Sequence, residues 1–284
     1  MRFWHSTGTV PRGTVLLEEG MHNLNLPYIG ITDFTHVNQV VIMRTVLNKA
    51  GCRHLLGVGV MMSYKTLKGL ETKWAKAWPP KEAIADIFVQ REGVLNVLHY
   101  ADYDGETTAN DLIEAIQWAG PGVDAVQLDM IWPSLQMLED VKKSVFGQRV
   151  KFILQVNEKA IEQCDGNPAK VAEQLTHYRR INCLDYALFD LSMGKGKPLE
   201  ATRLMSHIWK SIEATPELAV AVAGGLGPTS MDLAAPIIRD LPDVSLDAQS
   251  KLRPSGSALD PIDWSSAAVY LREAANLIKQ ARRT

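Results

Sequence analysis

Short apolar runs alternate with segments of helical periodicity along almost the whole chain. Each run is only a few residues long, continuously apolar and rich in β-branched side chains, which is the pattern of strands buried on both faces. A first strand is predicted at Leu26–Thr32. Clearer strands follow at Leu55–Val60, Val94–Leu98, Ala125–Leu128, Phe152–Val156, Tyr186–Phe189, Leu218–Val222 and Val244–Leu246.

Helical patterns lie between these runs, at His36–Ala50, Thr108–Ala119, Leu135–Val145, Pro168–Arg180, Leu199–Thr215, Met231–Asp240 and Trp264–Arg282. Asp263 is a suitable N-cap for the last helix. Steady alternation of strand and helix predicts an α/β protein with a parallel sheet and right-handed crossovers. Eight such units favour a closed (β/α)8 TIM barrel. An open doubly wound sheet is the alternative, although no GxGxxG nucleotide signature follows the first strand.

The length of 284 residues suits one barrel, since this fold typically needs about 250 residues. No linker rich in Gly, Pro or Ser divides the chain, so we predict a single domain over residues 1–284. Roughly residues 1–25 precede the first strand, as a short extension that caps the bottom of the barrel or pairs with another subunit. The sequence therefore leaves a homo-oligomer open.

Charge and composition exclude several classes of partner. The net charge is −2 and no dense basic stripe appears, which argues against nucleic acid. No apolar run approaches the roughly 18 residues of a membrane span. Cys52, Cys164 and Cys183 lie far apart, which argues against disulfides and a cysteine zinc site. With no signal-peptide pattern at the start, the sequence predicts a cytoplasmic protein.

Polar residues at the strand ends are the candidates for a site, because these ends converge on one mouth of a barrel. They are Thr32, Asp33, Ser63, Lys65, His99, Asp102, Gln127, Asp129, Gln155, Asn157, Asp190, Ser192 and Asp247. Asp190 directly follows an apolar run, where partial desolvation suits a carboxyl group to general acid catalysis. Asp129 and His99 are candidates for the second acid–base group that an isomerisation needs. Each of the three has a structural alternative as a helix cap, an ion-pair partner or a core residue.

The turn Gly224-Gly225-Leu226-Gly227 follows the seventh strand. Its glycines let backbone N–H groups approach an anion, and a helix N-terminus beyond them would add a favourable dipole. The alternative is a tight turn that needs positive φ. Lys195 and Lys197 are further candidates for holding a phosphate or carboxylate. Asp247 also falls at this predicted phosphate site, where its charge repels an anion unless Lys251 offsets it.

Two other kinds of chemistry are weaker hypotheses. Asp102, Asp129, Asp190 and Asp247 are possible ligands of a hard cation, but their spacing does not single out a metal site, and none is predicted. Lys65 is a candidate Schiff-base lysine of an aldolase, which requires a desolvated amine.

Several short motifs resemble phosphoribosylanthranilate isomerase, in matching order over roughly residues 27 to 280. They are Gly30-Ile31-Thr32, Val123–Leu128, Tyr186–Asp190, Ala221–Pro228 and Asp243–Ser245 followed by Asp260. The resemblance implies a (β/α)8 barrel that performs an Amadori rearrangement without a cofactor. It also implies that Asp190 is the general acid. The family's basic cysteine aligns with Ile29, and Asp129-Met130 and Leu246-Asp247 replace two of its other site motifs.

These observations lead to two hypotheses of different class. The first is an isomerase-like enzyme acting on a small phosphorylated sugar or another anionic metabolite by acid–base chemistry, with phosphoribosylanthranilate isomerase itself as the narrowest form. The second is a non-catalytic barrel that binds a metabolite or a protein.

Overall fold

The structure, a computed structural model, is a closed barrel of parallel strands in the order of the sequence, which confirms the predicted (β/α)8 fold. It describes residues 25–192, 198–257 and 259–283. The strands are β1 (Tyr28–Thr32), β2 (Leu55–Ser63), β3 (Val94–Ala101), β4 (Ala125–Asp129), β5 (Lys151–Asn157), β6 (Tyr186–Asp190), β7 (Ala219–Val222) and β8 (Ser245–Ala248). The ring closes where β1 pairs with β8, with Gly30 opposite Asp247.

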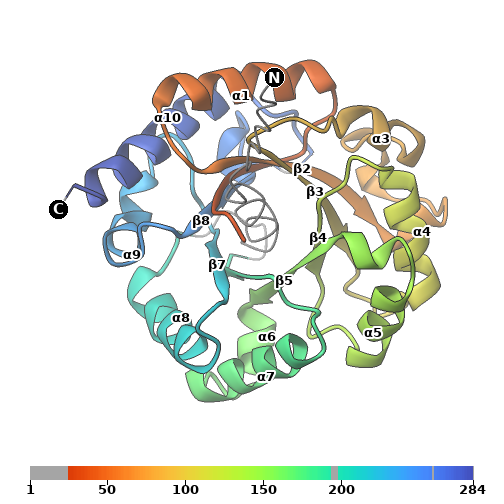
Figure 1. Cartoon of the computed structure of the whole chain (residues 1–284). Coiled ribbons are helices and arrows are strands. Elements are labelled where there is room, and N and C mark those ends of the chain that lie inside the picture. Colours follow the sequence, from red (N-terminus) through yellow and green to blue (C-terminus); the bar gives the residue numbers. More distant parts are fainter. Residues whose placement is uncertain (1–24, 193–197, 258, 284) are drawn as a thin grey trace, which may run out of the picture.

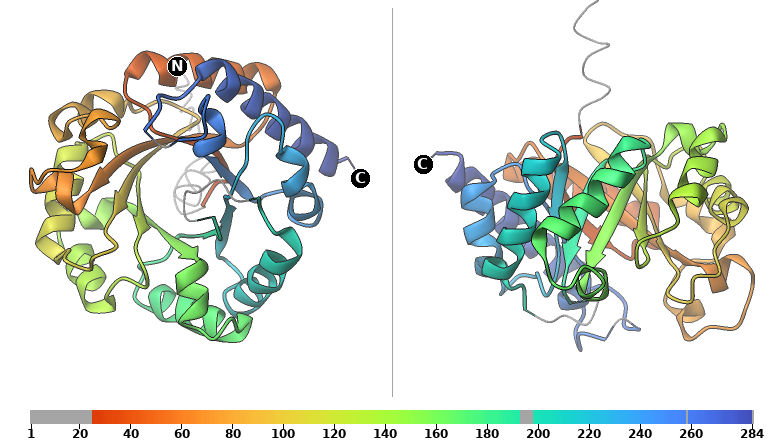
Figure 2. Two further views of the ribbon diagram at one scale, coloured as in Figure 1. Left: turned by 180° about the vertical axis from the view of Figure 1, so that it is seen from behind. Right: turned by 90° about the horizontal axis from the view of Figure 1, so that it is seen from below.

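Helices form an outer ring around the strands (Figures 1 and 2). They are α1 (Val37–Ala50), α2 (Tyr64–Leu67), α3 (Ile84–Ile87), α4 (Ala109–Ala119), α5 (Leu135–Lys143), α6 (Glu158–Glu162), α7 (Pro168–Arg180), α8 (Ala201–Ala214), α9 (Ala235–Asp240) and α10 (Trp264–Ala281). Shorter 3-10 helices are η2 (Lys73–Lys76), η3 (Lys81–Ala83), η4 (Gly147–Arg149), η5 (Met231–Ala234) and η6 (Ser250–Leu252).

The helix ends follow the capping residues in the sequence. Asp263 accepts hydrogen bonds from the amides of Ser265 and Ser266, which confirms it as the N-cap of α10. Helix α5 ends at Lys143, two residues before the predicted end, and the Ser144 hydroxyl donates to the Val141 carbonyl. Strand β1 begins at Tyr28 and not at Leu26, since Pro27 has no N–H to donate to a ladder.

Two apolar cores fill the molecule because side chains alternate along each strand. Outward-facing residues such as Ile29, Val58 and Leu98 pack under the helices. Inward-facing residues such as Val97, Ile153 and Leu188 fill the lower part of the barrel. Burial on both faces explains why the strand sequences are continuously apolar.

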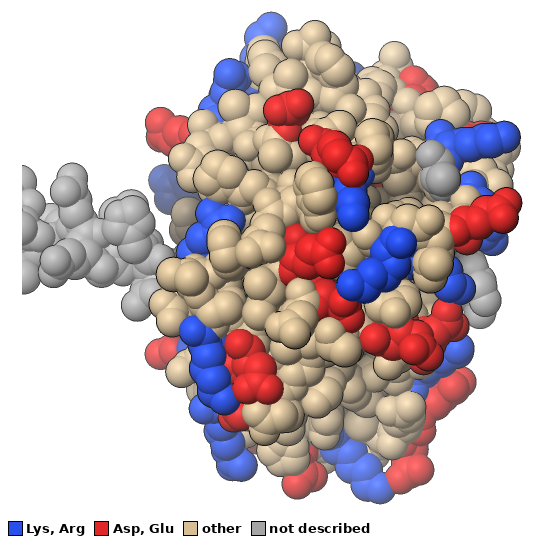
Figure 3. Space-filling model, turned by 90° about the vertical axis from the view of Figure 1, so that its right-hand side faces the viewer, with Lys and Arg blue, Asp and Glu red and all other residues tan. Residues whose placement is uncertain are grey.

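The outer surface carries charges of both signs. On the side of α4, Lys and Arg side chains are interspersed with Asp and Glu (Figure 3), and Lys68 pairs there with Asp111 and Glu114. This face has no single-sign surface suited to nucleic acid. In the ranges that the structure describes, no helix has both the length and the apolar character needed to cross a bilayer. The predicted N-terminal extension lies outside these ranges.

Candidate active site

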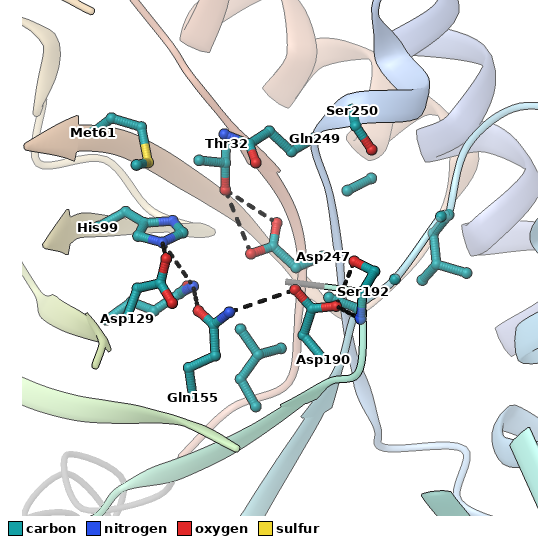
Figure 4. Close-up of a pocket in the computed structure, with 17 residues that line it drawn as sticks. Thr32, Met61, His99, Asp129, Gln155, Asp190, Ser192, Asp247, Gln249 and Ser250 are labelled. Atoms are coloured by element: carbon teal, nitrogen blue, oxygen red, sulfur yellow. Dashed lines mark hydrogen bonds and ion pairs between the residues drawn. The ribbon is translucent and has the colours of Figure 1, made fainter. Parts of the chain in front are cut away.

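A polar layer covers the apolar filling of the barrel at the C-terminal ends of the strands. Since every second residue of a strand faces inward, the inward position after Val97 is His99, that after Ala125 is Gln127, and that after Ile153 is Gln155. The same step leads from Leu188 to Asp190 and from Ser245 to Asp247. These polar residues, with Thr32 and Asp129, line one cavity of about 70 Å³ (Figure 4).

A chain of hydrogen bonds runs across this cavity from Gln127 on β4 to Asp190 on β6, with His99 on β3 in contact with Gln127. The Nε2 group of Gln127 lies 3.4 Å from His99 Nε2 and donates to Gln155 Oε1 over 3.1 Å. Gln155 Nε2 in turn donates to Asp190 Oδ2 over 3.4 Å. Both amides are buried, with 2% and 5% of their surfaces exposed. The two glutamines therefore hold His99 and Asp190 in fixed positions on opposite sides of the layer.

His99 forms a buried ion pair with Asp129, with Nε2 and Oδ2 3.6 Å apart. Burial alone lowers the pKa of His99, but the carboxylates of Asp129, Asp247 and Asp33 together raise it above its usual value. These carboxylates favour the charged form of the imidazole, which carries an N–H group on both ring nitrogens. Its Nδ1 is buried and has no hydrogen-bond partner among the described residues.

Asp190 accepts hydrogen bonds at both carboxyl oxygens. Oδ1 accepts from the backbone amide of Ser192 over 2.8 Å and from its hydroxyl over 2.6 Å, and Oδ2 accepts from Gln155. Three donated bonds match an ionised carboxylate, which has only acceptors. These hydrogen bonds stabilise the ionised form of Asp190, and the general-acid role that the resemblance implies stays a prediction.

Asp247 is buried and lies at the seam between β8 and β1. Only 8% of its surface is exposed, and Thr32 Oγ1 lies 3.4 Å from each of its carboxyl oxygens. Burial raises its pKa to about 7, and the charge of Asp190 adds to the rise while that of His99 opposes it. Asp247 consequently exchanges its proton near neutral pH.

Asp33 and Arg253 form a second buried ion pair beside the cavity, with 4% and 2% of their side chains exposed. Gln249 also donates to Asp33 Oδ2 over 2.8 Å. Asp33 has a φ of 86°, which is rare for a residue with a side chain. Burial raises the pKa of Asp33 despite the opposing charge of Arg253. Asp33 is thus the ion-pair partner of Arg253.

The glycine turn after β7 fulfils only part of its prediction. Gly224 and Gly225 line the cavity with φ values of 116° and 61°, so the tight turn that needs positive φ is present. Gly227 does not line the cavity, and a Cβ there would lie 2.7 Å from the Cβ of Lys251. The turn leads into the 3-10 helix η5 in place of the expected α-helix N-terminus, which weakens the case for an anion site.

Other predicted residues lie away from the cavity. Lys65 is half exposed and pairs with Asp104 over 2.9 Å, which raises the pKa of its amine and contradicts the Schiff-base hypothesis. Asp102 accepts bonds from the backbone amides of its own loop, including that of Thr107 over 2.7 Å. Lys195 and Lys197 lie outside the described residues. Among the residues described, no three His, Cys, Asp or Glu side chains gather to hold a metal ion.

Three residues of the site were not among the site residues that the sequence predicts. The Tyr103 hydroxyl donates to Asp129 Oδ1, and only its place just beyond β3 pointed to the mouth of the barrel. Arg253 lies 220 residues from Asp33 in sequence. Gly30 stands opposite Asp247 across the seam that closes the ring. Both of these contacts become visible only once the barrel closes.

Comparison with known proteins supports the fold. No family model and no curated protein matches the chain. The carboxyl transferase domain of Rhizobium etli pyruvate carboxylase, with pyruvate, is 13% identical with a TM-score of 0.53, and the match covers 93% of this chain and 50% of that one. N-acetylneuraminic acid synthetase from Leptospira borgpetersenii, in complex with citrate, is 12% identical with a TM-score of 0.56. This match covers 90% of this chain and 84% of that one. These likenesses show the barrel fold, without evidence specific to phosphoribosylanthranilate isomerase.

Proposed function

We propose that this chain is a barrel enzyme that transfers protons on a small polar metabolite. The observation that supports the proposal is that His99 and Asp190 line one buried cavity, where Gln127 lies 3.4 Å from His99 Nε2 and donates to Gln155, which in turn donates to Asp190. In this proposal His99 is the proton donor and Asp190 the proton acceptor. Such a pair is the minimum equipment of general acid–base catalysis.

The reaction that fits this pair is an isomerisation next to a carbonyl group. Asp190 takes a proton from the carbon beside the carbonyl, and the C–H electrons form a C=C bond while His99 gives a proton to the carbonyl oxygen. Removal of the proton from the neighbouring hydroxyl or amino group and return of a proton to the former carbonyl carbon then give the isomer. The proton count of the substrate is unchanged. The resemblance to phosphoribosylanthranilate isomerase supports this class of reaction.

Asp129 has a positioning role in this proposal. Its carboxylate lies beside His99 and accepts a hydrogen bond from Tyr103. A buried carboxylate favours the charged form of the imidazole, which keeps the proton donor loaded at neutral pH.

Hydrogen exchange tests the proposal whichever isomer is formed. The protein is incubated in deuterium oxide with a panel of small hydroxy and amino aldehydes and ketones and their phosphorylated counterparts, and proton NMR follows the C–H signal beside the carbonyl. We expect enzyme-dependent exchange with at least one compound and a loss of about 100-fold or more in Asp190→Asn. The exposed Asp165→Asn is the matched control and keeps the wild-type rate. Folded wild-type protein that exchanges no member of the panel contradicts the proposal and favours the non-catalytic alternative.

A further inference from the structure

Asp247 is a buried carboxylate that forms no ion pair within the part of the chain that the structure describes. Two buried basic side chains beside the cavity are paired with other carboxylates, His99 with Asp129 and Arg253 with Asp33. Lys251, which the sequence suggested as its counter-ion, is exposed. The charge of His99 offsets part of the cost of ionising this buried carboxylate, and a cation on a ligand at this position would offset more of it.

The Asp247 carboxylate packs against the backbone of Gly30. Gly30 faces it across the seam, and the absence of a side chain there leaves room for Oδ1. Thr32 donates a weak hydrogen bond to it from the same strand as Gly30. Figure 4 shows the Asp247 carboxylate beside Thr32 and across the cavity from His99. A ligand in the cavity therefore has access to both groups.

His99 offers a second polar group to a ligand in this cavity. Its Nδ1 is buried without a partner among the described residues, while the residue is only 7% exposed and lines the same cavity. A buried N–H group that lacks an acceptor destabilises a protein. An oxygen atom on a ligand satisfies it. The cavity thus offers one position for a cation and another for an oxygen acceptor.

We propose that the cavity binds a small primary amine that also carries an oxygen function, with the ammonium group on Asp247 and the oxygen on Nδ1 of His99. A phosphorylated substrate fits these positions poorly, because its anionic group would lie beside Asp247. The inference rests on the proposed function for the chemistry that follows binding, but the binding itself stands on the Asp247 carboxylate and the His99 imidazole. It makes the substrate an amino alcohol or an amino carbonyl compound.

Calorimetric titration with ethanolamine tests the charge requirement on the wild-type protein. Ethylene glycol has the same shape without the ammonium group, and inorganic phosphate represents the anionic alternative. We expect ethanolamine to bind at least 10-fold more tightly than either. Equal or tighter binding of ethylene glycol or phosphate, or no binding of ethanolamine, overturns the proposal.

Substitution of Asp247 tests whether its carboxylate binds the ammonium group. Asp247→Asn keeps the shape of the side chain and is expected to weaken ethanolamine binding by about 10- to 100-fold, the range for a hydrogen bond between charged groups. Asp243→Asn, at the exposed end just before β8, is the matched control and leaves the affinity unchanged. Unaltered affinity in Asp247→Asn also overturns the proposal.

The pH dependence separates an amine from an anion. The groups that act on Asp247 are His99 on β3, Asp190 on β6, Thr32 and Tyr28 on β1, and Tyr270 on α10. Burial raises the pKa of Asp247 to about 7, so ethanolamine affinity rises with pH up to about that value and then levels off. An affinity that falls over this range contradicts the proposal.

The experiments test the proton-transfer function and the amine-binding site independently of each other. If ethanolamine binds as expected but no compound of the panel exchanges its C–H proton, the binding site stands and the proton-transfer function is wrong. If a phosphorylated sugar exchanges and ethanolamine does not bind, the function stands and the amine site is wrong.

Discussion

The carboxylate of Asp247 lies against the backbone of Gly30, its register partner on β1. A Cβ at Gly30 would lie 2.7 Å from Asp247 Oδ1 and 3.1 Å from its Cγ, closer than real side chains pack. The seam that closes the barrel is thus also the wall of the candidate site. We expect Gly30→Ala to displace Asp247 and to cost about 1–3 kcal/mol of stability through overpacking. Urea unfolding should show that the Gly30→Ala variant is folded, and titration with ethanolamine should show that it binds this amine more weakly than the wild type does. Unchanged affinity would contradict the predicted displacement of Asp247.

Asp247 also predicts how stability depends on pH. Its pKa is about 7 in the folded protein against an ordinary value of 3.8, so the folded state binds the proton more tightly and stability falls as the pH rises between these values. Since one pKa unit corresponds to about 1.4 kcal/mol, the ionised Asp247 lowers the free energy of unfolding above pH 7 by about 4 kcal/mol.

Asp247→Asn removes this penalty. Urea unfolding should show the variant to be more stable than the wild type at pH 8, by up to about 4 kcal/mol, and the gain should shrink as the pH is lowered to 5. Asp243→Asn, exposed just before the same strand, should change stability by no more than about 0.5 kcal/mol at either pH. A gain of equal size at pH 5 and pH 8 would be inconsistent with a buried titrating carboxylate.

The Asp33–Arg253 pair predicts a large loss of stability on removal of one partner. Arg253→Met leaves the Asp33 carboxylate buried without its counter-ion, and we expect a loss of about 3–5 kcal/mol in urea unfolding at pH 7. Arg239→Met removes an exposed pair with Asp240 and should cost less than about 1 kcal/mol. The double variant Asp33→Asn with Arg253→Met should recover much of the loss, and a purely additive result would argue against a coupled pair.

The glutamine chain predicts a kinetic effect from a residue that does not itself exchange protons. Gln155→Leu removes the donor to Asp190 and the acceptor of Gln127, so each loses one fixed partner. With whichever compound shows exchange, we expect kcat to fall about 10-fold, since about 1.4 kcal/mol of stabilisation corresponds to tenfold, and its pH profile to shift. The exposed Gln163→Leu serves as the control. A change in stability with an unaltered pH profile would reduce Gln155 to a packing role.

The sequence predicts the barrel well because its signals are local. Apolar runs such as Phe152–Val156 are buried on both faces, and capping residues such as Asp263 mark helix starts. The same locality identifies the strand ends, so Asp129, Asp190 and His99 are correctly placed at one mouth. A polar residue at a strand end can be identified as a site candidate as soon as its strand is recognised.

Contacts made by ring closure are not local and escape this reasoning. Thr32 reaches Asp247 over 215 residues of sequence, and Asp190 accepts hydrogen bonds from Gln155 and Ser192 that no spacing reveals. Gly227 shares a motif with Gly224 and Gly225, yet it is fixed by packing against Lys251. A glycine-rich string indicates a turn, and only the fold tells which of its members face the ligand.

The glutamine chain and both of its ends stand on strand residues, and the loops contribute little to it. Framework positions hold catalytic side chains more accurately than loop positions do. Loops at the rim could therefore be exchanged for those of other barrels while the polar layer of strand residues keeps its geometry, which makes this layer a fixed base on which new entrances can be engineered.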